Sequence, residues 1–260
     1  MTHHHPIALI TGAGKRIGKA IALTLAHHGW DIAIHYHHSQ SDALSTQLLI
    51  EQMGRQAICV QCDLGDTQDV ASLSSRVQQQ LGHPTLLVNN ASLFEYDNPE
   101  QMNVDLFDQH MTINVKAPIL LSEAFYKTQK ANNQQGVIVH LLDQKLVNPN
   151  PDYLSYTLSK AALSASIPLL ALHYAPFVRV MGIAPGLTLP SGPQSVNHFN
   201  TIQTMNPLGH SPTPEDIAKS VLYIAEVNSL TGSTIYVDAG QHLVPSKRDV
   251  MFIDPNTLSG

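Results

Sequence analysis

The fold is indicated by Ile7-Ala8-Leu9-Ile10-Thr11-Gly12-Ala13-Gly14-Lys15-Arg16-Ile17-Gly18, in which an apolar strand pattern runs into a glycine-rich turn. An amphipathic helix pattern follows over Lys19–His28. Backbone N–H groups and the helix dipole at such a junction attract an anion such as a pyrophosphate, and glycine permits its close approach. Many strand-to-helix turns carry glycines without a ligand, and the spacing here differs from G-x-G-x-x-G. The position of the turn directly after the first strand is what favours a phosphate site.

Strand and helix patterns alternate over the rest of the chain. Short apolar runs typical of strands occupy Ile7–Thr11, Ile32–Tyr36, Ala57–Gln61, Thr85–Val88, Val137–Leu141, Val178–Ile183 and Ser233–Val237. Helical patterns cover Ile17–His28, Asp42–Met53, Thr67–Leu81, Val104–Lys130 and Tyr156–Tyr174. The alternation predicts parallel strands joined by right-handed crossovers, and the continuously apolar strands predict a sheet covered on both faces. Because no linker or repeat interrupts it, we expect residues 1–260 to form a single α/β domain.

Two stretches depart from this alternation. Residues 186–214 are rich in Pro, Gly, Ser, Asn and Thr and lack a strand pattern. Long loops in compact domains usually have a function, so we expect a substrate lid at about 186–214. Pro168 lies inside a helical pattern, where it is expected to remove one hydrogen bond and kink the helix.

Composition argues against several classes of function. A formal net charge of −6 and a pI of about 6.2 do not fit a nucleic-acid surface, which needs clustered Lys and Arg. No apolar run approaches the ~20 residues of a membrane span, and residues 1–6 lack the pattern of a secretory signal, so we expect a cytoplasmic protein.

Cys59 and Cys62 lie in a strand pattern, where residues three apart face opposite sides, so we interpret them as ordinary strand cysteines. The 15 histidines lack the spacing of a zinc hydrolase, and no metal is expected.

The end of the second strand predicts which dinucleotide the chain binds. It reads Ile34-His35-Tyr36-His37-His38-Ser39, without the Asp or Glu that would hold the ribose 2′-hydroxyl of NAD. An acid there would repel a 2′-phosphate, whereas histidines, Ser39 and the nearby Arg16 would attract one. We therefore expect NADPH. The alternative is a solvated turn whose histidines have no ligand.

Tyr156 and Lys160 form the pair expected to move a proton. Residues four apart share one face of a helix. A lysine ammonium beside a phenol favours the phenolate and lowers the pKa of the tyrosine from ~10 towards the operating pH. Tyr156 is therefore a candidate general acid for a carbonyl or imine that is being reduced. Such a pair is common on helices by chance, so its context decides its meaning.

That context resembles the short-chain dehydrogenase/reductase family. The motifs of that family recur in order and spacing across nearly the whole chain, as Thr11-Gly12-x3-Arg16-x-Gly18, Asp63-Leu64, Asn89-Asn90-Ala91, Asn114, Tyr156-x3-Lys160, Pro185-Gly186-x-Thr188 and the closing run Thr231–Asp238. The resemblance implies one Rossmann-type, doubly wound sheet of seven parallel strands flanked by helices, with the cofactor across the carboxyl ends of the strands. It also implies assembly into a homo-oligomer, a dimer or a tetramer.

The resemblance carries functional residues over at matching positions. It implies a catalytic group of Asn114, Tyr156 and Lys160, to which this chain adds Asp143. It implies cofactor contacts from Gly12, Arg16, Ile17, Gly18, His35, Tyr36, His37, His38, Ser39, Asp63, Leu64, Asn90, Ala91, Lys160, Pro185, Gly186 and Thr188.

Departures from the wider family concern the substrate. Most members have a serine about thirteen residues before the tyrosine, where this chain has Asp143, a glycine where it has Arg16, and another glycine where it has Ser92. All three differences are similar to pteridine reductases and the related dihydromonapterin reductases. In that subgroup a phenylalanine at the position of Phe94 stacks on a pterin and sandwiches it against the nicotinamide. The turn His35-Tyr36-His37-His38-Ser39 also resembles that of the subgroup, but an arginine often found in that turn is His38 in this chain, which bears on the strength of the NADPH preference.

These features predict a substrate site of Arg16, Ser92, Phe94, Asp143 and Tyr156 for a flat heterocycle with edge N–H donors. The alternatives are core packing for Phe94 and loop capping for Asp143.

The function expected is NADPH-dependent hydride transfer to a C=N bond of a pterin or dihydrofolate-like substrate. The alternatives are a carbonyl reductase similar to 3-oxoacyl carrier-protein reductases, against which Asp143 counts, and an NADPH-binding sensor without turnover, against which the intact Asn114, Tyr156 and Lys160 count.

Overall fold

The computed structural model describes residues 5–190 and 195–253 and contains one seven-stranded parallel sheet. Its strands lie in the order β3-β2-β1-β4-β5-β6-β7, and every neighbouring pair is parallel. They are β1 (Ile7–Ile10), β2 (Asp31–Tyr36), β3 (Ala57–Gln61), β4 (Leu86–Asn89), β5 (Gly136–Leu141), β6 (Val178–Pro185) and β7 (Thr234–Val237). All seven predicted strands are confirmed, and with them the doubly wound fold.

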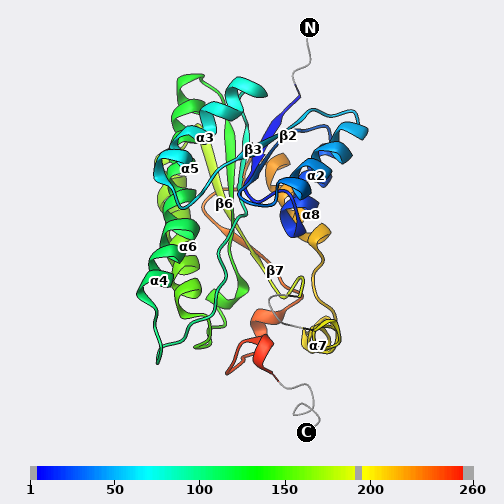
Figure 1. The fold of residues 1–260 in the computed structure, drawn as a ribbon, viewed down its shortest axis with the longest axis vertical. Coiled ribbons are helices and arrows are strands. Elements are labelled where there is room, and N and C mark those ends of the chain that lie inside the picture. Colours follow the sequence, from blue (N-terminus) through cyan, green and yellow to red (C-terminus); the bar gives the residue numbers. More distant parts are fainter. Residues whose placement is uncertain (1–4, 191–194, 254–260) are drawn as a thin grey trace.

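Helices cover both faces of the sheet (Figure 1). They are α1 (Arg16–His27), α2 (Gln40–Gln52), α3 (Thr67–Gln80), α4 (Val104–Met111), α5 (Ala117–Ala131), α6 (Leu154–Tyr174), α7 (Val196–Ile202) and α8 (Pro214–Glu226). The helices α1, α2 and α8 lie on one face, and α3, α5 and α6 lie on the other. No helix in the described part of the chain is long and apolar enough to cross a membrane.

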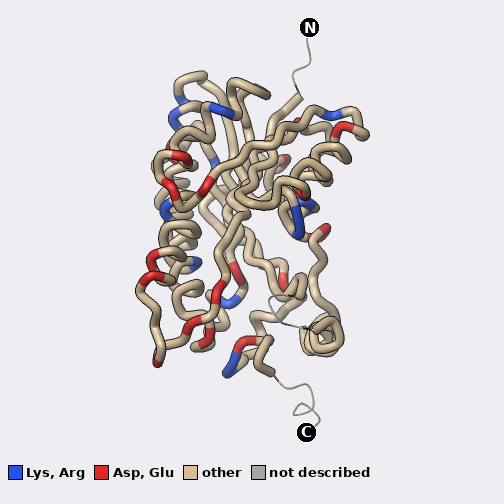
Figure 2. Tube along the Cα trace, in the orientation of Figure 1, with Lys and Arg blue, Asp and Glu red and all other residues tan. Residues whose placement is uncertain are grey.

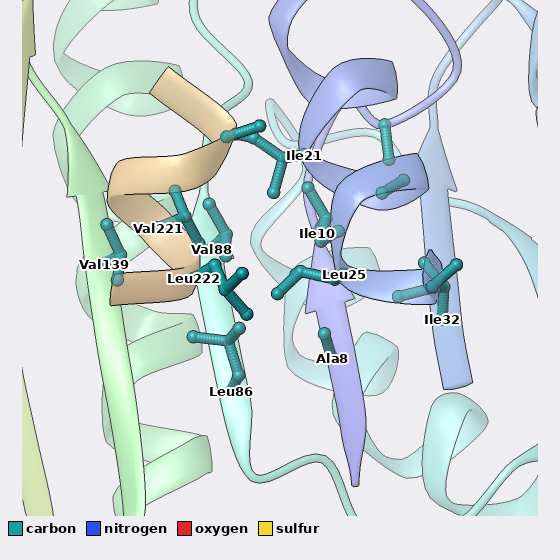
Figure 3. Packing of buried hydrophobic residues seen from close by; sticks show 14 of the residues in the cluster. Ala8, Ile10, Ile21, Leu25, Ile32, Leu86, Val88, Val139, Val221 and Leu222 are labelled. Carbon is teal, nitrogen blue, oxygen red and sulfur yellow. The ribbon is translucent and has the colours of Figure 1, made fainter. Parts of the chain in front are cut away.

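Each face of the sheet has its own apolar core. On one face Ile21 and Leu25 of α1 pack with Val221 of α8 over the side chains of β1 and β4 (Figure 3). On the other, Leu121 of α5 and Leu163 of α6 belong to the second core. The cysteines follow the same division, because Cys59 packs against the first core and Cys62 lies within the second. Burial raises the pKa of Cys59 to about 11 and that of Cys62 to about 12, which leaves both thiols protonated and unreactive.

The strand order places a ligand crevice at the carboxyl ends of β1 and β4. The chain winds outward from β1 to β3 in one direction and from β4 to β7 in the other. Connections on the two sides of this reversal leave in opposite directions, which opens a crevice at the end of the sheet. The turn after β1 opens at this crevice. The segment leading to the C-terminus and α7 lie at the same end (Figure 1).

Three expectations need comment. The single helix expected over Val104–Lys130 is wrong in detail, because a π-helical turn, η1 (Thr112–Lys116), separates α4 from α5. Pro168 does lie inside α6, which continues past it to Tyr174. In the expected lid over 186–214, no strand occurs among the described residues, and α7 and a short helical turn, η3 (Gln203–Met205), occupy its middle. Residues 191–194 of that lid lie outside the described residues.

Candidate active site

The buried side chain of His35 supports the glycine-rich turn after β1. Gly12 has a left-handed backbone (φ +65°), and its N–H donates to His35 Nδ1 at 3.0 Å. The other ring nitrogen of His35 lies 3.0 Å from Cys62 O. The side chain is only 2% exposed, and burial lowers its pKa to about 4, so the ring is neutral. This corrects the expectation that His35 contacts a 2′-phosphate: the ring points into the protein and supports the turn.

The helix that follows the turn leaves its first N–H groups open to an anion. Lys15 precedes α1 without a side-chain cap, and the first turn of α1 contains no acid. The first four N–H groups of a helix have no partner within the helix, so a ligand or water must satisfy them. Gly18 lies against the turn so closely that a Cβ there would be 2.3 Å from Gly12 O. The turn and the helix N-terminus are thus packed into one unit.

The loop after β2 presents two exposed imidazoles. The rings of His37 and His38 lie with centroids 3.5 Å apart and planes tilted by 31°, and His37 Nε2 lies 3.8 Å from Asp63 Oδ1. Ser39 follows directly and precedes α2 without capping it through its side chain. Tyr36 and Leu64 are buried, so only their backbone or one edge can face a ligand.

The loop after β4 is pinned to the turn after β1. Thr11 Oγ1 accepts hydrogen bonds from the N–H groups of Asn90 (2.9 Å) and Ala91 (3.0 Å). Asn90 Nδ2 donates back to Thr11 O at 2.8 Å and to Gly12 O at 3.3 Å. Thr11 was missing from the predicted site, although it stands in the quoted motif. Its role depends on contacts between residues about 80 positions apart in the chain.

Asn114 acts within the scaffold of the site. It lies in η1, where the wider turn directs its amide towards the loop after β4. Its Oδ1 accepts from Leu93 N at 2.8 Å, and its Nδ2 donates to Leu93 O at 3.0 Å and to Ser159 Oγ at 3.0 Å. Ser92 Oγ also donates to Asn114 Oδ1, at 3.2 Å. Asn114 therefore ties the loop that carries Ser92 to the helix that carries Tyr156.

The start of α6 is built to hold Tyr156. Tyr153 precedes the helix in the left-handed region (φ +57°), a conformation that costs a non-glycine residue energy and is common near functional sites. Asp97 supplies the cap that sequence reasoning missed: its Oδ1 accepts from Ser155 N at 2.9 Å, and its Oδ2 accepts from the Ser155 hydroxyl. Buried carboxylates that accept such bonds fix a helix N-terminus firmly.

Tyr156 and Asp143 form a direct hydrogen bond. Tyr156 Oη donates to Asp143 Oδ2 at 2.9 Å, and Lys145 N donates to Asp143 Oδ1 at 2.8 Å. Asp143 is therefore both the cap of the helical turn η2 (Gln144–Leu146) and the partner of the phenol. Lys160 Nζ donates to Leu141 O at 2.7 Å and lies 5.7 Å from the centroid of the Tyr156 ring.

The pKa of Tyr156 is shifted in the opposite direction to the one expected from its spacing to Lys160. Burial and the neighbouring Asp143 raise the pKa of Tyr156 well above its ordinary value, so Lys160 does not lower it in this arrangement. Burial also raises the pKa of Asp143, and burial lowers the pKa of Lys160 to about 8. The reason is that Lys160 is turned to a backbone carbonyl, whereas the carboxyl group of Asp143 touches the phenol. Tyr156 is thus held as a neutral O–H donor.

A cavity of about 840 Å³ connects these groups. The predicted residues that line it are Arg16, Ile17, Asn90, Ser92, Phe94, Asp143, Tyr156, Lys160, Pro185, Gly186 and Thr188. The remaining predicted residues lie outside its lining, in β2, α1, η1 and the loops after β1, β2, β3 and β4: Gly12, Gly18, His35, Tyr36, His37, His38, Ser39, Asp63, Leu64, Ala91 and Asn114. The whole predicted substrate group therefore faces one cavity.

Phe94 is both packed and exposed to the cavity. Its ring stacks on Tyr153 (centroids 4.2 Å apart, planes at 17°) and meets Tyr156 edge-on at 4.7 Å. Tyr153 in turn stacks on Phe252 at 6.1 Å. This aromatic ladder holds the Phe94 ring in place at the cavity wall.

The outer wall of the cavity was absent from the prediction. It is formed by Val244–Ile253, a segment that follows β7 and includes the helical turn η5 (Val250–Phe252). Two short-range signals lie in its sequence, the charged run Lys247-Arg248-Asp249 and the aromatic Phe252, but neither indicates which cavity it covers. Among the residues that the structure describes, no group of three His, Cys, Asp or Glu side chains is arranged to hold a metal ion.

Comparison with known proteins places this geometry in a family. The family model described as Enoyl-(Acyl carrier protein) reductase matches residues 12–242. The FolM alternative dihydrofolate reductase 1 of Brucella suis, crystallised in complex with NADP, is 38% identical with a TM-score of 0.89, and the match covers 96% of this chain and 99% of that one. An acetoin dehydrogenase of Enterobacter cloacae is 26% identical with a TM-score of 0.85, over 93% of this chain and 97% of that one.

A sequence relative agrees with these structures. An uncharacterized oxidoreductase of Thermotoga maritima is 31% identical over 256 residues, which are 94% of this chain and all of the relative. The family model spans the chain from Gly12 in the turn after β1 through the Tyr156–Lys160 helix to β7, and the relative covers 94% of the chain. The chain therefore belongs to the short-chain dehydrogenase/reductase family of oxidoreductases.

Proposed function

We propose that this protein reduces a C=N bond of a pterin or dihydrofolate-like substrate with NADPH, and that Tyr156 donates the proton. The observation that carries the proposal is the Tyr156–Asp143 hydrogen bond beside the Phe94 ring at one cavity. A ketone requires one hydroxyl donor, whereas a ring nitrogen with neighbouring amino groups also requires an acceptor, which Asp143 supplies. The similarity to the FolM reductase of Brucella suis supports the same substrate class.

The residues present fit a dinucleotide with a 2′-phosphate. The uncapped N-terminus of α1, with no acid in its first turn, would hold the pyrophosphate, and Lys160 and Asn90 face the cavity beside it. His37, His38 and Ser39 would hold the 2′-phosphate, since their run contains no acid; the carboxylate beside it is that of Asp63, 3.8 Å from His37 Nε2. When bound, NADPH supplies the hydride. The complex of the FolM reductase with NADP supports this cofactor for the present chain.

The chain's own groups deliver the proton. Tyr156 remains neutral because burial and Asp143 raise its pKa, so it can donate its proton when negative charge develops on the substrate nitrogen. Once the phenol has given up its proton, Asp143, whose pKa burial raises, can take up a proton from solvent and pass it to Tyr156 along their hydrogen bond. Lys160 Nζ, which donates to Leu141 O and lies 5.7 Å from the centroid of the Tyr156 ring, would stabilise the phenolate by its charge on turning towards the phenol oxygen.

The cofactor preference is a first testable expectation. NADPH should be used over NADH by at least about tenfold in kcat/KM, which corresponds to ~1.4 kcal/mol. Arg16→Gly should reduce kcat/KM with NADPH more than with NADH, because it removes a guanidinium beside the turn. The backbone at Arg16 is already left-handed (φ +54°), a conformation that glycine adopts readily, so the substitution tests the side chain alone. Equal efficiency of the wild-type protein with both cofactors would contradict the assignment.

Ordered binding of a flat antifolate tests the substrate slot. If the slot lies between Phe94 and the nicotinamide, a diaminopteridine antifolate should bind only after NADPH has formed one wall. Ligand binding to the folded state raises the melting temperature by mass action. The antifolate should therefore raise the melting temperature further in the presence of NADPH and little or not at all without it.

Variants identify the residues in that slot. Phe94→Ala should remove most of the rise in melting temperature that the antifolate adds to that of NADPH. The reason is that the loss of one stacking face costs on the order of 1 kcal/mol of binding free energy beyond area burial. Asp143→Ser should reduce the same rise in melting temperature, because it removes the carboxylate that would accept hydrogen bonds from the amino groups of the antifolate ring. Phe107→Ala is the matched control, since Phe107 lies in α4 and does not line the cavity. An antifolate increment that is independent of NADPH, or unchanged in Phe94→Ala, contradicts the slot.

A carbonyl reductase is the second candidate. The fold similarity to the acetoin dehydrogenase of Enterobacter cloacae favours it. The same Tyr156 and Lys160 would serve that reaction, but Asp143 would take the place of a hydroxyl donor to the substrate carbonyl. Faster reduction of acetoacetyl esters than of dihydropterins, together with no NADPH-dependent antifolate shift, would select this candidate.

A further inference from the structure

The cavity is closed on its outer side by a segment that is fastened at several points. Val244 O accepts from Asn148 Nδ2 at 2.8 Å, and Ile253 O lies 2.8 Å from His198 Nε2 of α7. Tyr153 Oη donates to Met251 Sδ at 3.1 Å. These contacts bring the segment Val244–Ile253 across the carboxyl ends of the strands, where Figure 1 shows it beside α7.

An ion-pair group fastens the middle of the segment, and we call its four residues, Lys145, Asp152, Arg248 and Asp249, the clasp. Arg248 binds Asp152 through two hydrogen bonds, from Nε to Oδ2 (2.8 Å) and from Nη2 to Oδ1 (2.9 Å). Asp249 N also donates to Asp152 Oδ2, at 2.7 Å. Lys145 Nζ donates to Asp152 O at 2.5 Å and to Asp249 Oδ2 at 3.2 Å. Figure 2 shows acidic and basic residues side by side in this part of the chain.

The clasp is more than a surface ion pair. The side chains of Lys145 and Asp152 are almost fully buried and that of Asp249 is 14% exposed, while Arg248 closes the group from the half-exposed side. Partners held in this way carry charge-assisted bonds in a poorly solvated place, where breaking one leaves the other uncompensated. A two-bond guanidinium–carboxylate contact also fixes orientation, and it sets the position of Asp249 next to Lys145.

Lys145 connects the clasp to the reacting groups. Its side chain binds Asp249, and its backbone N–H donates to Asp143 Oδ1 at 2.8 Å. The other oxygen of Asp143 accepts from Tyr156. A continuous path of three contacts therefore leads from the outer wall of the cavity to the proton donor.

From this path we infer that Asp249 is a positioning residue: it holds Lys145 and, through the backbone of Lys145, orients Asp143 towards Tyr156, so that closure of the outer wall and alignment of the proton donor depend on each other. Asp249 touches no reacting atom in this role. The inference rests on the proposed function in so far as Asp143 acts beside Tyr156. It adds a residue that the family motifs quoted above do not contain.

The charge of Asp249 gives the role a signature. The groups that face Asp143 are Tyr156 and Lys160 from α6, Lys145 from η2 and Asp249 from the outer wall. The carboxylate of Asp249 raises the pKa of Asp143, whereas Lys145 lowers it. Neutralising Asp249 removes the first effect and also removes the carboxylate that partly offsets the charge of Lys145, whose Nζ keeps its bond to Asp152 O, so both changes lower the pKa of Asp143.

The test is the pH dependence of Asp249→Asn. This variant should lose about tenfold or more in kcat, because misalignment of a reacting group by an ångström or less is costly. The limb of its kcat–pH profile that follows Asp143 should move to lower pH by about half a unit or more. Hydrogen exchange in Val244–Ile253 should become faster. Asp249→Glu, which keeps the charge, should restore much of kcat and return the profile towards that of the wild type.

Glu123→Gln is the matched control. Glu123 forms an exposed ion pair with Lys127 on α5, so this variant also removes one carboxylate while leaving rate, profile and exchange unchanged. A wild-type kcat in Asp249→Asn, or a reduced kcat with an unshifted profile, overturns the inference, the second outcome indicating only a looser wall. Hydrogen exchange needs no substrate, and the profile can be recorded with a dihydropterin or an acetoacetyl ester. Failure of the pterin assignment is thereby distinguished from failure of the positioning role.

Discussion

Tyr156→Phe is expected to lower kcat by about 10²- to 10⁴-fold, the range that a positioned general acid contributes. The phenol O–H donates to Asp143 and faces the cavity, and phenylalanine keeps the ring while removing only the donor. The affinity for NADPH should change little, because the hydroxyl is assigned to the transition state. Single-turnover oxidation of NADPH and a separate measurement of NADPH binding by fluorescence distinguish these two effects.

The residual rate of Tyr156→Phe also shows whether Tyr156 or another group donates the proton. If Tyr156→Phe retained more than a tenth of the wild-type rate, another group would have to donate the proton, and Asp143 would be the first candidate because burial raises its pKa. The melting temperature serves as the control for folding. Loss of the phenol leaves one oxygen of a buried carboxyl group without its partner, so a modest decrease is expected.

Gly18→Ala is expected to weaken NADPH binding by about a hundredfold or more, which corresponds to ~2.7 kcal/mol. A Cβ at this position would lie 2.3 Å from Gly12 O and 2.6 Å from Asn90 Nδ2. Atoms cannot approach this closely, so the turn must move away from α1. The backbone N–H groups that would bind the pyrophosphate then lose their arrangement. Overpacking of this kind also costs about 1–3 kcal/mol of stability.

Gly54→Ala is the matched control for this change. Gly54 follows α2 with a left-handed backbone (φ +75°) and no neighbour within 4 Å of a built Cβ. Alanine there should reduce the melting temperature through backbone strain alone and leave the NADPH dissociation constant unchanged. Isothermal titration of both variants provides the comparison. Binding of NADPH to Gly18→Ala within threefold of the wild type would contradict the role of the turn.

The order of elements followed from the sequence because local patterns control it. Runs of about five apolar residues mark strands covered on both faces, and the run Ile7–Ile10 followed by Gly12 indicates a strand, turn and helix without further information. The position of Tyr156 and Lys160 on one helix face could be inferred in the same way, since residues four apart lie on the same side of a helix. The pairing of Asp143 with Tyr156 required the comparison of spacing with a family.

Tertiary structure alone decided which groups meet and what charge they carry. His35 was assigned to a phosphate from its place in the sequence, yet it is buried, because the turns after β1 and β3 meet over its ring and bond both of its nitrogens, through Gly12 N and Cys62 O. The effect of Lys160 on Tyr156 was expected from their spacing, but burial and contact with Asp143 set the pKa of the phenol in the opposite direction. The outer wall, with Asp249 bound to Lys145 104 residues away, left no signal in sequence spacing. Burial and long-range contact depend on how the chain returns to the same end of the sheet, and no local pattern contains that information.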